Sequence, residues 1–190
     1  MKDKEIVKLG LILLIIASVA GFILAGAYSI TKVPIENQNV KTNKEAMKEL
    51  ITDAEDFKKV QGVNEKNILE VNEAIADSKT IGYTIKVSSK GYSGEIQTMV
   101  GISTKGEVTG IKILSQSETP GLGANAVQPK FSGQYKNKPL ANALEVVKHA
   151  VSKPNEIEAM TGATITSKAV TTGVNEAVDF YKNKLKGGQK

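Results

Sequence analysis

The sequence of 190 residues contains no cysteine, no arginine and no tryptophan, and it has a single histidine. The absence of cysteine excludes disulfides, thiolate catalysis, cysteine-ligated zinc and cysteine-ligated iron–sulfur clusters. It also excludes a lipoprotein anchor, because that anchor needs an acylated cysteine. The lone His149 lies in a helical-looking run and makes a poor metal site without partners, so we expect a structural or surface role and no bound metal. Any redox chemistry must therefore come from a bound organic cofactor.

The charge balance argues against a nucleic-acid-binding protein. All 25 basic residues are lysine, and they face 20 acidic residues, so the formal net charge is only +5. The lysines are spread along the chain instead of forming a stripe. Without arginine the chain also lacks the bidentate contacts with phosphates and base edges that DNA readers favour. A length of 190 residues leaves room for one ordinary domain and an appendage.

The longest apolar run extends from Leu9 to Ile30 and holds no charged residue. As a helix it would be about 33 Å long, at roughly 1.5 Å per residue, which is enough to cross a bilayer core. A cleaved signal peptide is the alternative, because Ala25-Gly26-Ala27 has the small residues of a cleavage site. The run is longer than a typical signal-peptide core, so we favour a retained anchor.

Lysine counts on the two sides of this run do not decide its orientation. Three lysines precede it and three follow within about fifteen residues, so only the terminal amine favours a cytoplasmic N-terminus. We expect four regions: a cytoplasmic N-terminus at 1–8, a transmembrane anchor at 9–30, a membrane-proximal helical segment at 31–66 and one domain at 67–190. The helix of the third region is predicted at about 36–52, with turn-like chain at 58–66.

The section after residue 66 is rich in β-branched and alternating apolar residues. The pattern predicts strands at Asn67–Ala76, Thr80–Ser88, Glu95–Thr104 and Glu107–Leu114, with a tight hairpin at Lys105-Gly106. Helices are predicted at about 141–152 and after residue 163. The fold class is therefore α+β: one antiparallel sheet flanked by helices, preceded by one transmembrane helix.

Two stretches have the composition of ligand-binding loops. In Ser117–Gly123 the proline fixes φ, while Gly121 and Gly123 allow backbone conformations closed to other residues. This loop either approaches a ligand or turns a corner. The stretch Lys90-Gly91-Tyr92-Ser93-Gly94 joins two predicted strands and can be read simply as a turn.

Hydroxyl side chains are concentrated in Met160–Ser167, immediately before a helical pattern. Apolar residues then recur at spacings of three and four: Val170, Val174, Ala177, Val178, Tyr181 and Leu185. A helix N-terminus has unpaired N–H groups and the positive end of the dipole, which suits a phosphate. The alternative is a helix capped by one of these hydroxyls.

The same residues resemble a known family. Thr161-Gly162-Ala163-Thr164 is similar to the Ser/Thr-Gly-Ala-Thr signature of the FMN-binding domain in the G subunit of Rnf electron-transport complexes, shared by the C subunit of the sodium-pumping NADH:quinone reductase. Ser117–Gly123 is similar to that family's Glu-Thr-Pro-Gly-Leu-Gly loop. Lys90–Gly94 resembles its Gly-Tyr-Gly-Gly loop, with Ser93 in place of a frequent glycine. The resemblance covers nearly the whole chain.

The resemblance implies a covalently bound FMN, attached through a phosphoester to Thr164. Leu122 would pack on the flavin ring and Thr119 would contact the ring or the ribityl chain. Glu118 would bond either a loop amide, which we favour, or the ring edge. The candidate cofactor-binding residues are Thr161, Gly162, Ala163, Thr164, Ile165, Thr166, Ser167, Glu118, Thr119, Gly121, Leu122 and Gly123. No residue is assigned as a catalytic acid or base.

The resemblance also implies an electron-relay subunit, not a complete enzyme. It would serve an Rnf-type ferredoxin:NAD⁺ oxidoreductase coupled to Na⁺ or H⁺ transport, with its domain outside the cytoplasmic membrane. Its partners would be the other subunits and a flavin transferase that uses FAD and Mg²⁺. Glu158 stands where relatives often have an aspartate and is a candidate contact for that enzyme, while Lys168 is a candidate countercharge for the phosphate. The alternatives are a quinone-reductase subunit of the C type, a standalone surface flavoprotein and a flavin-free membrane-anchored scaffold.

Overall fold

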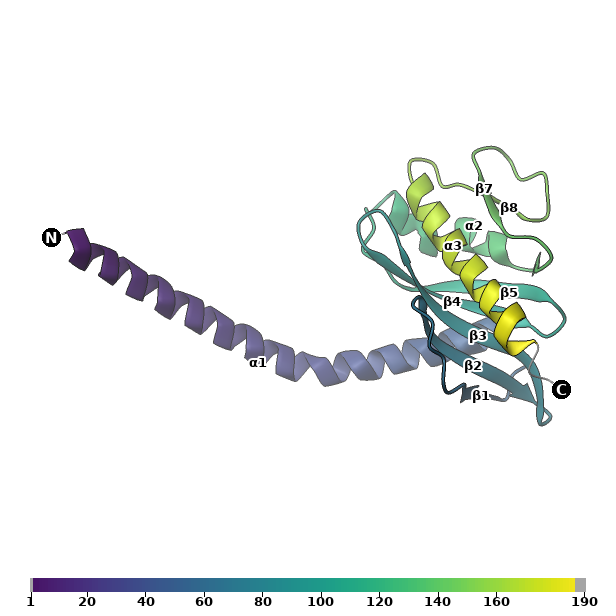
Figure 1. The fold of residues 1–190 in the computed structure, drawn as a ribbon, viewed down its shortest axis with the longest axis horizontal. Helices are drawn as coiled ribbons and strands as arrows, with labels where there is room; N and C mark the ends of the chain where they lie inside the picture. The colour runs from purple at the N-terminus through teal and green to yellow at the C-terminus, as the bar shows by residue number, and fades with distance from the viewer. Residues whose placement is uncertain (1, 187–190) are drawn as a thin grey trace. The chain divides into compact units, whose positions relative to one another are not determined.

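The computed structural model describes residues 2–186. Contacts divide the chain into two compact units, Met1–Thr42 and Asn43–Lys190, named here unit 1 and unit 2. Helix α1 (Lys2–Leu50) accounts for unit 1, and its last residues, from Asn43 on, belong to unit 2, which holds all the other elements (Figure 1).

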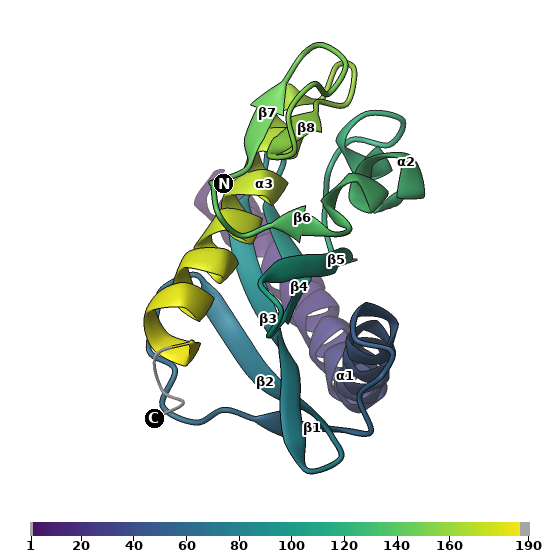
Figure 2. The same ribbon diagram turned by 90° about the vertical axis from the view of Figure 1, so that its right-hand side faces the viewer.

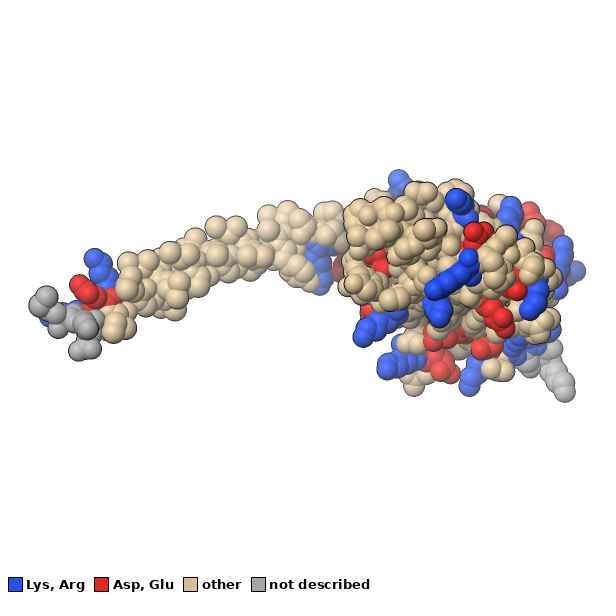
Figure 3. All heavy atoms as spheres, turned by 90° about the horizontal axis from the view of Figure 1, so that it is seen from above, with Lys and Arg blue, Asp and Glu red and all other residues tan. Residues whose placement is uncertain are grey.

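Unit 1 is a single apolar helix. Its large apolar side chains from Ile6 to Ile35 are exposed, and residues 9–30 carry no charged side chain. Figure 3 shows the corresponding uncharged length of helix, with charges gathered near its start. By length and composition this helix can cross a membrane. The helical stretches expected at 9–30 and 36–52 are parts of one continuous helix, which also includes Pro34.

Unit 2 contains a six-stranded antiparallel sheet with its strands in sequence order. The strands are β1 (Asp56–Lys59), β2 (Ile68–Ala76), β3 (Lys79–Lys90), β4 (Glu95–Ser103), β5 (Glu107–Ser115) and β6 (Lys138–Pro139). The four strands predicted from the sequence are confirmed as β2 to β5. The turn at Lys105-Gly106 is also confirmed, since Gly106 has φ +93° and its N–H donates to Ser103 O at 3.1 Å. Strand β1 overlaps the first two residues of the stretch 58–66, which is expected from the sequence to be turn-like.

Helix α3 (Thr164–Phe180) covers one face of this sheet (Figure 2). Its apolar positions belong to the main core with side chains of β3, β4 and β5; the fully buried members include Val170, Val174, Ala177, Ile85, Val87 and Val100. Gly173 brings the helix close to the sheet, because a Cβ there would lie 3.0 Å from Val87 Cγ2. A short helical turn, η3 (Tyr181–Leu185), continues α3, and Tyr181 packs on Tyr83 with ring centroids 5.7 Å apart.

The opposite face of the sheet is covered by the last turns of α1. Ala46, Met47, Leu50 and Ile51 are buried there together with Ala74 and Met99. Gly101 allows this close approach, since a Cβ at that position would lie 2.9 Å from Leu50 Cβ. The C-terminal end of α1 is therefore part of the core of unit 2.

The remaining elements connect β5 to α3. They are η1 (Gly123–Val127), α2 (Pro129–Ser132), η2 (Gly133–Tyr135) and a parallel pair, β7 (Glu145–Val147) and β8 (Glu156–Glu158). The predicted helix at 141–152 is wrong, because its centre is strand β7. Asn175 of α3 exchanges two hydrogen bonds with the backbone of Leu144, which removes groups that a local helix would need. His149 lies exposed in the loop that follows β7.

Candidate functional site

A cleft of about 550 Å³ lies where three segments of unit 2 meet. Its lining residues are Tyr92, Glu118, Thr119, Leu122, Gly123, Gly162, Ala163, Thr164, Ile165 and Thr166. The β3–β4 turn, the loop after β5 and the start of α3 each contribute to it. The volume falls within the roughly 300–1,000 Å³ that small-molecule sites occupy. The fold thus brings together the two stretches singled out in the sequence, although about 40 residues separate them.

The first turn of α3 presents unused hydrogen-bond donors to this cleft. The N-cap residue is Ala163, and no side chain caps the helix within the described part of the chain. The backbone N–H groups of Thr164, Ile165 and Thr166 likewise have no acceptor among the described residues. The capped-helix alternative is therefore wrong. Three donors without an acceptor in the described part of the chain, at the positive end of a 17-residue helix, are suited to binding an anion.

Two of the four hydroxyl side chains in Met160–Ser167 are engaged in hydrogen bonds within the protein. Ser167 Oγ is buried, donates to Ala163 O at 2.9 Å and accepts from Met160 N at 3.0 Å, which holds the turn before the helix. Thr166 Oγ1 donates to Glu118 Oε2. Thr161 is exposed and does not line the cleft. Thr164 is half-buried, lines the cleft, and its hydroxyl has no partner in residues 2–186.

Glu118 ties the three segments together. Its buried carboxylate accepts the Ser93 N–H at 2.9 Å from the β3–β4 turn and the Thr166 hydroxyl from α3. Burial raises the pKa of this carboxyl, but the hydrogen bond from Thr166 and the amides of Ser93, Tyr92 and Gly94 together lower it below its ordinary value. Glu118 is therefore ionised at neutral pH, and the loop-fixing role favoured from the sequence is confirmed.

Two glycines make room for this carboxylate. A Cβ on Gly91 would lie 2.5 Å from Glu118 Oε1, and a Cβ on Gly123 would lie 2.6 Å from Oε2. Gly162 has φ +74°, and a Cβ there would lie 3.0 Å from Leu122 Cδ2. The glycines of all three segments thus permit the close approach of backbone on which the cleft depends. Gly121, with φ +77°, shapes the loop but does not line the cleft.

The rim of the cleft is apolar. Tyr92, Leu122 and Ile165 line it while remaining 71%, 44% and 55% exposed. Large exposed apolar side chains beside free amides suit a ligand with an aromatic ring and an anionic group. Tyr92 was not among the predicted site residues. The sequence feature that points to Tyr92 is its position in the turn Lys90–Gly94, which resembles the family's Gly-Tyr-Gly-Gly loop.

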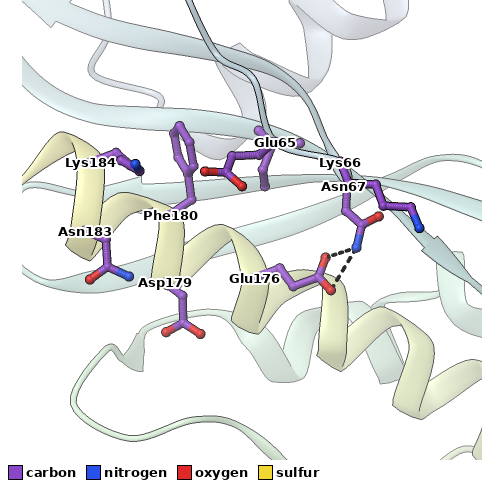
Figure 4. A pocket seen from close by; sticks show the side chains of 9 residues that line it. Glu65, Lys66, Asn67, Glu176, Asp179, Phe180, Asn183 and Lys184 are labelled. Atoms are coloured by element: carbon purple, nitrogen blue, oxygen red, sulfur yellow. Dashed lines mark hydrogen bonds between the residues drawn. The ribbon is translucent and has the colours of Figure 1, made fainter.

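Two other cavities of unit 2 do not bring the predicted cofactor-binding residues together. One of about 290 Å³ lies between the start of β2 and the end of α3, where Asn67 Nδ2 donates to both carboxylate oxygens of Glu176 at 3.0 Å (Figure 4). Lys168 lines a neighbouring hollow beside Ile165, not the cleft itself. Glu158 is exposed and lines none of these hollows. Within residues 2–186 no cluster of acidic or histidine side chains is suited to a metal ion.

The sequence matches two family models. Residues 91–179 match the FMN-binding domain, and residues 1–50 match the RnfG N-terminal region. The cleft lies entirely within the first of these regions.

Several characterised proteins are similar along most of their length. The G subunit of the Na⁺-translocating ferredoxin:NAD⁺ oxidoreductase complex of Acetobacterium woodii is 41% identical, over 95% of this chain and 93% of that protein. The G subunit of the proton-translocating complex of Clostridium ljungdahlii is 44% identical, over 85% and 83%. Among solved structures, the C subunit of the Na⁺-translocating NADH-quinone reductase of Parabacteroides distasonis has the same fold, with TM-score 0.60 and 20% identity over 78% of this chain and 94% of that one.

Proposed function

The chain belongs to the G-subunit family of ion-translocating oxidoreductase complexes, with an FMN-binding domain, and from this premise we propose that it is an electron-transfer subunit of a ferredoxin:NAD⁺ oxidoreductase coupled to Na⁺ or H⁺ transport. The observation that carries the proposal is the start of α3. There, three backbone amides and the Thr164 hydroxyl, none of which has a partner among the described residues, lie at a cleft with an apolar rim.

These residues fit an FMN. The amides of Thr164, Ile165 and Thr166 would hold its phosphate, and the helix dipole favours the negative charge. Tyr92 and Leu122 would flank the isoalloxazine ring. The bound flavin supplies the electron-transfer chemistry, and the protein holds it in place and shields it.

The flavin would be attached through a phosphoester to Thr164. In this step the Thr164 oxygen would form a bond to the FMN phosphorus of FAD, the pyrophosphate bond would break, AMP would leave and the hydroxyl proton would pass to solvent. A separate flavin transferase with Mg²⁺ would catalyse this step. Thr164 suits it because its hydroxyl has no partner among the described residues and lies beside the amides, whereas the hydroxyls of Thr166 and Ser167 are bonded within the protein.

Unit 1 would anchor the protein in the cytoplasmic membrane, with the N-terminus inside and unit 2 outside. Support comes from the apolar helix and from the family membership. Protease added to intact protoplasts should then digest unit 2; complete protection of unit 2 would contradict this orientation.

The attachment is tested with Thr164→Val, made together with the flavin transferase. We expect wild-type protein to gain the mass of one FMN less one water on the peptide that contains Thr164, and Thr164→Val to carry none while keeping its circular dichroism. Thr172→Val is the matched control, since Thr172 is exposed on the same helix and lies outside the cleft. Flavin still bonded in Thr164→Val would refute the assignment. An unmodified wild type beside a flavinylated positive control would favour the scaffold alternative.

A further inference from the structure

The cleft contains one charged side chain. Of the residues that line it, only Glu118 belongs to the charged types, which are aspartate, glutamate, lysine, arginine and histidine. Glu118 is 5% exposed, whereas the charged residues that border the cleft segments, Lys90, Glu95, Glu158 and Lys168, are exposed at the surface. Salt screens exposed charges strongly and buried charges much less. One negative charge therefore dominates the electrostatic field inside the cleft.

No cation offsets this charge. Within the described part of the chain Glu118 takes part in no ion pair, and its hydrogen-bond donors, the Ser93 amide at 2.9 Å and the Thr166 hydroxyl, are neutral. The backbone of Gly91 and Gly123 packs closely against the two carboxylate oxygens, since a Cβ on these glycines would lie 2.5 Å and 2.6 Å from them. Neutral donors stabilise the ionised carboxyl group, but they leave its unit of charge in place.

We propose that the negative charge of Glu118 lowers the midpoint potential of the flavin held in the cleft. This inference rests on the proposed function, because it takes FMN as the cofactor. Each electron that enters the isoalloxazine ring without a proton adds a unit of negative charge to the cleft, and a fixed carboxylate in the cleft wall opposes that addition. Glu118 thus has two roles: it joins the segments that form the cleft, and it tunes the cofactor that they hold.

Coulomb's law gives the expected size of the effect. Two like charges about 10 Å apart, across an effective dielectric constant of about 20, disfavour one another roughly tenfold in an equilibrium constant. The positive end of α3 would not cancel this effect, because the phosphate of FMN would occupy the amides of Thr164, Ile165 and Thr166. Lys168 is exposed and lines the neighbouring hollow, so salt screens its charge. The uncompensated charge in the cleft is therefore that of Glu118.

The test compares midpoint potentials in the full-length flavinylated protein. Wild type, Glu118→Gln and Glu118→Asp are titrated with dithionite and a reference dye at about pH 8, where carboxyl groups are ionised. Glu95→Gln is the matched control, because Glu95 follows the β3–β4 turn and is an exposed glutamate outside the cleft. Thr166→Val removes a hydrogen bond from Glu118 but keeps the charge. Flavin content and thermal unfolding are measured for every variant.

We expect Glu118→Gln to favour reduction at least tenfold, which is a rise of about 59 mV for a one-electron step or about 30 mV for a two-electron step. Glu118→Asp and Glu95→Gln should stay within about threefold of wild type, because the first keeps the buried charge and the second removes a screened one. Thr166→Val should lose stability without a rise in potential. The Glu118→Gln shift should persist at about 0.5 M salt, because a buried charge is poorly screened.

Equal potentials of Glu118→Gln and wild type would overturn the proposal. An equal rise in Thr166→Val would also overturn it, because a loosened cleft and not the charge would then account for the shift. If Glu118→Gln loads no flavin, Thr119→Lys and Thr119→Gln replace it, since Thr119 is exposed, lines the cleft and follows Glu118 in the chain. The lysine should raise the potential and the glutamine should not, and equal values would refute a role of charge.

Flavin content separates this inference from the proposed function. Wild type without flavin, beside a flavinylated positive control, would refute the proposed cofactor and this inference together. An unshifted potential in a fully flavinylated Glu118→Gln variant would refute this inference alone.

Discussion

At the scale of single residues, Glu118 has an unusual position. Its carboxylate is buried, and its hydrogen-bond donors, the Thr166 hydroxyl and the Ser93 amide, are neutral. Hydrogen bonds to a buried ionised group contribute about 1.5–3 kcal/mol to stability, more than those between neutral groups. One side chain therefore fixes the relative positions of the turn, the loop and the helix that form the cleft.

Replacement of Glu118 by glutamine should make stability less dependent on pH. The folded-state pKa of Glu118 lies below its ordinary value of about 4.3, so its contribution is fully present above that value and is lost as pH falls through the folded pKa. We expect Glu118→Gln to lower the free energy of unfolding by about 1.5–3 kcal/mol at pH 7 and by clearly less near pH 3.

Urea denaturation at pH 7, 5 and 3 measures this difference. Glu145→Gln is the control, because Glu145 is exposed on β7 and should change stability little at any of these pH values. A Glu118→Gln effect of the same size at pH 7 and pH 3 would show that the carboxylate charge does not matter.

At the scale of elements, the cleft depends on how closely three backbone segments approach one another. The loop after β5 contacts α3 through Gly123, where a Cβ would lie 2.5 Å from Thr166 Oγ1 and 2.9 Å from Glu118 Cβ. Neither of these neighbours is the far end of a long flexible side chain. A side chain at this glycine must therefore push the loop away from the helix or break the Thr166–Glu118 hydrogen bond.

Gly123→Ala should destabilise unit 2 by about 1–3 kcal/mol, the usual effect of overpacking, and should reduce flavin loading. Thermal unfolding measures the loss of stability, and flavin absorbance of the same samples measures the flavin loading. Gly133→Ala is the control, because Gly133 has helical φ of −65° and open space around its Cβ position. If the two alanine variants behaved alike, the close approach at Gly123 would have no energetic importance.

At the scale of the whole molecule, α1 serves both units. Its apolar first part suits a bilayer, while its last turns and the residue that follows them cover a face of the sheet, where Met47, Leu50 and Ile51 are buried. Burying each of these side chains contributes roughly 1.5–3 kcal/mol. Their sum is comparable to the total stability of a typical domain, about 5–15 kcal/mol.

Truncation of the chain should therefore show a sharp boundary inside α1. A fragment that begins at residue 43 should be soluble and unfold cooperatively, because it keeps the buried end of the helix. A fragment that begins at residue 55 should unfold at a much lower urea concentration or aggregate, since Ala74 and Met99 lose their cover.

Circular dichroism during urea titration distinguishes the two fragments. Full-length protein in detergent provides the reference transition for unit 2. Equal stability of the two fragments would mean that the end of α1 contributes little to the core.

Much of the architecture follows from local patterns in the sequence. The uncharged run from Leu9 to Ile30 has the length and composition of a membrane span, and alternation with β-branched residues placed four strands correctly. The stretches at 117–123 and 160–167 were recognisable as site segments because glycine, proline and hydroxyl residues have strong local backbone preferences. The family resemblance drawn from them is confirmed. Attachment at Thr164 stays a prediction.

Tertiary structure decided the features that depend on distant partners. Residues 144–150 have a helical spacing, yet β7 forms because β8 and Asn175 provide its hydrogen-bond partners. Hydroxyls near residue 164 have the composition of a capped helix, yet Thr166 bonds Glu118, 48 residues away, and no described side chain caps the helix amides. Tyr92 became a site residue only because the hairpin turn folds beside α3. A sequence pattern specifies the conformation a segment prefers by itself, whereas the partner of each polar group is selected by contacts between segments that only the folded chain brings together.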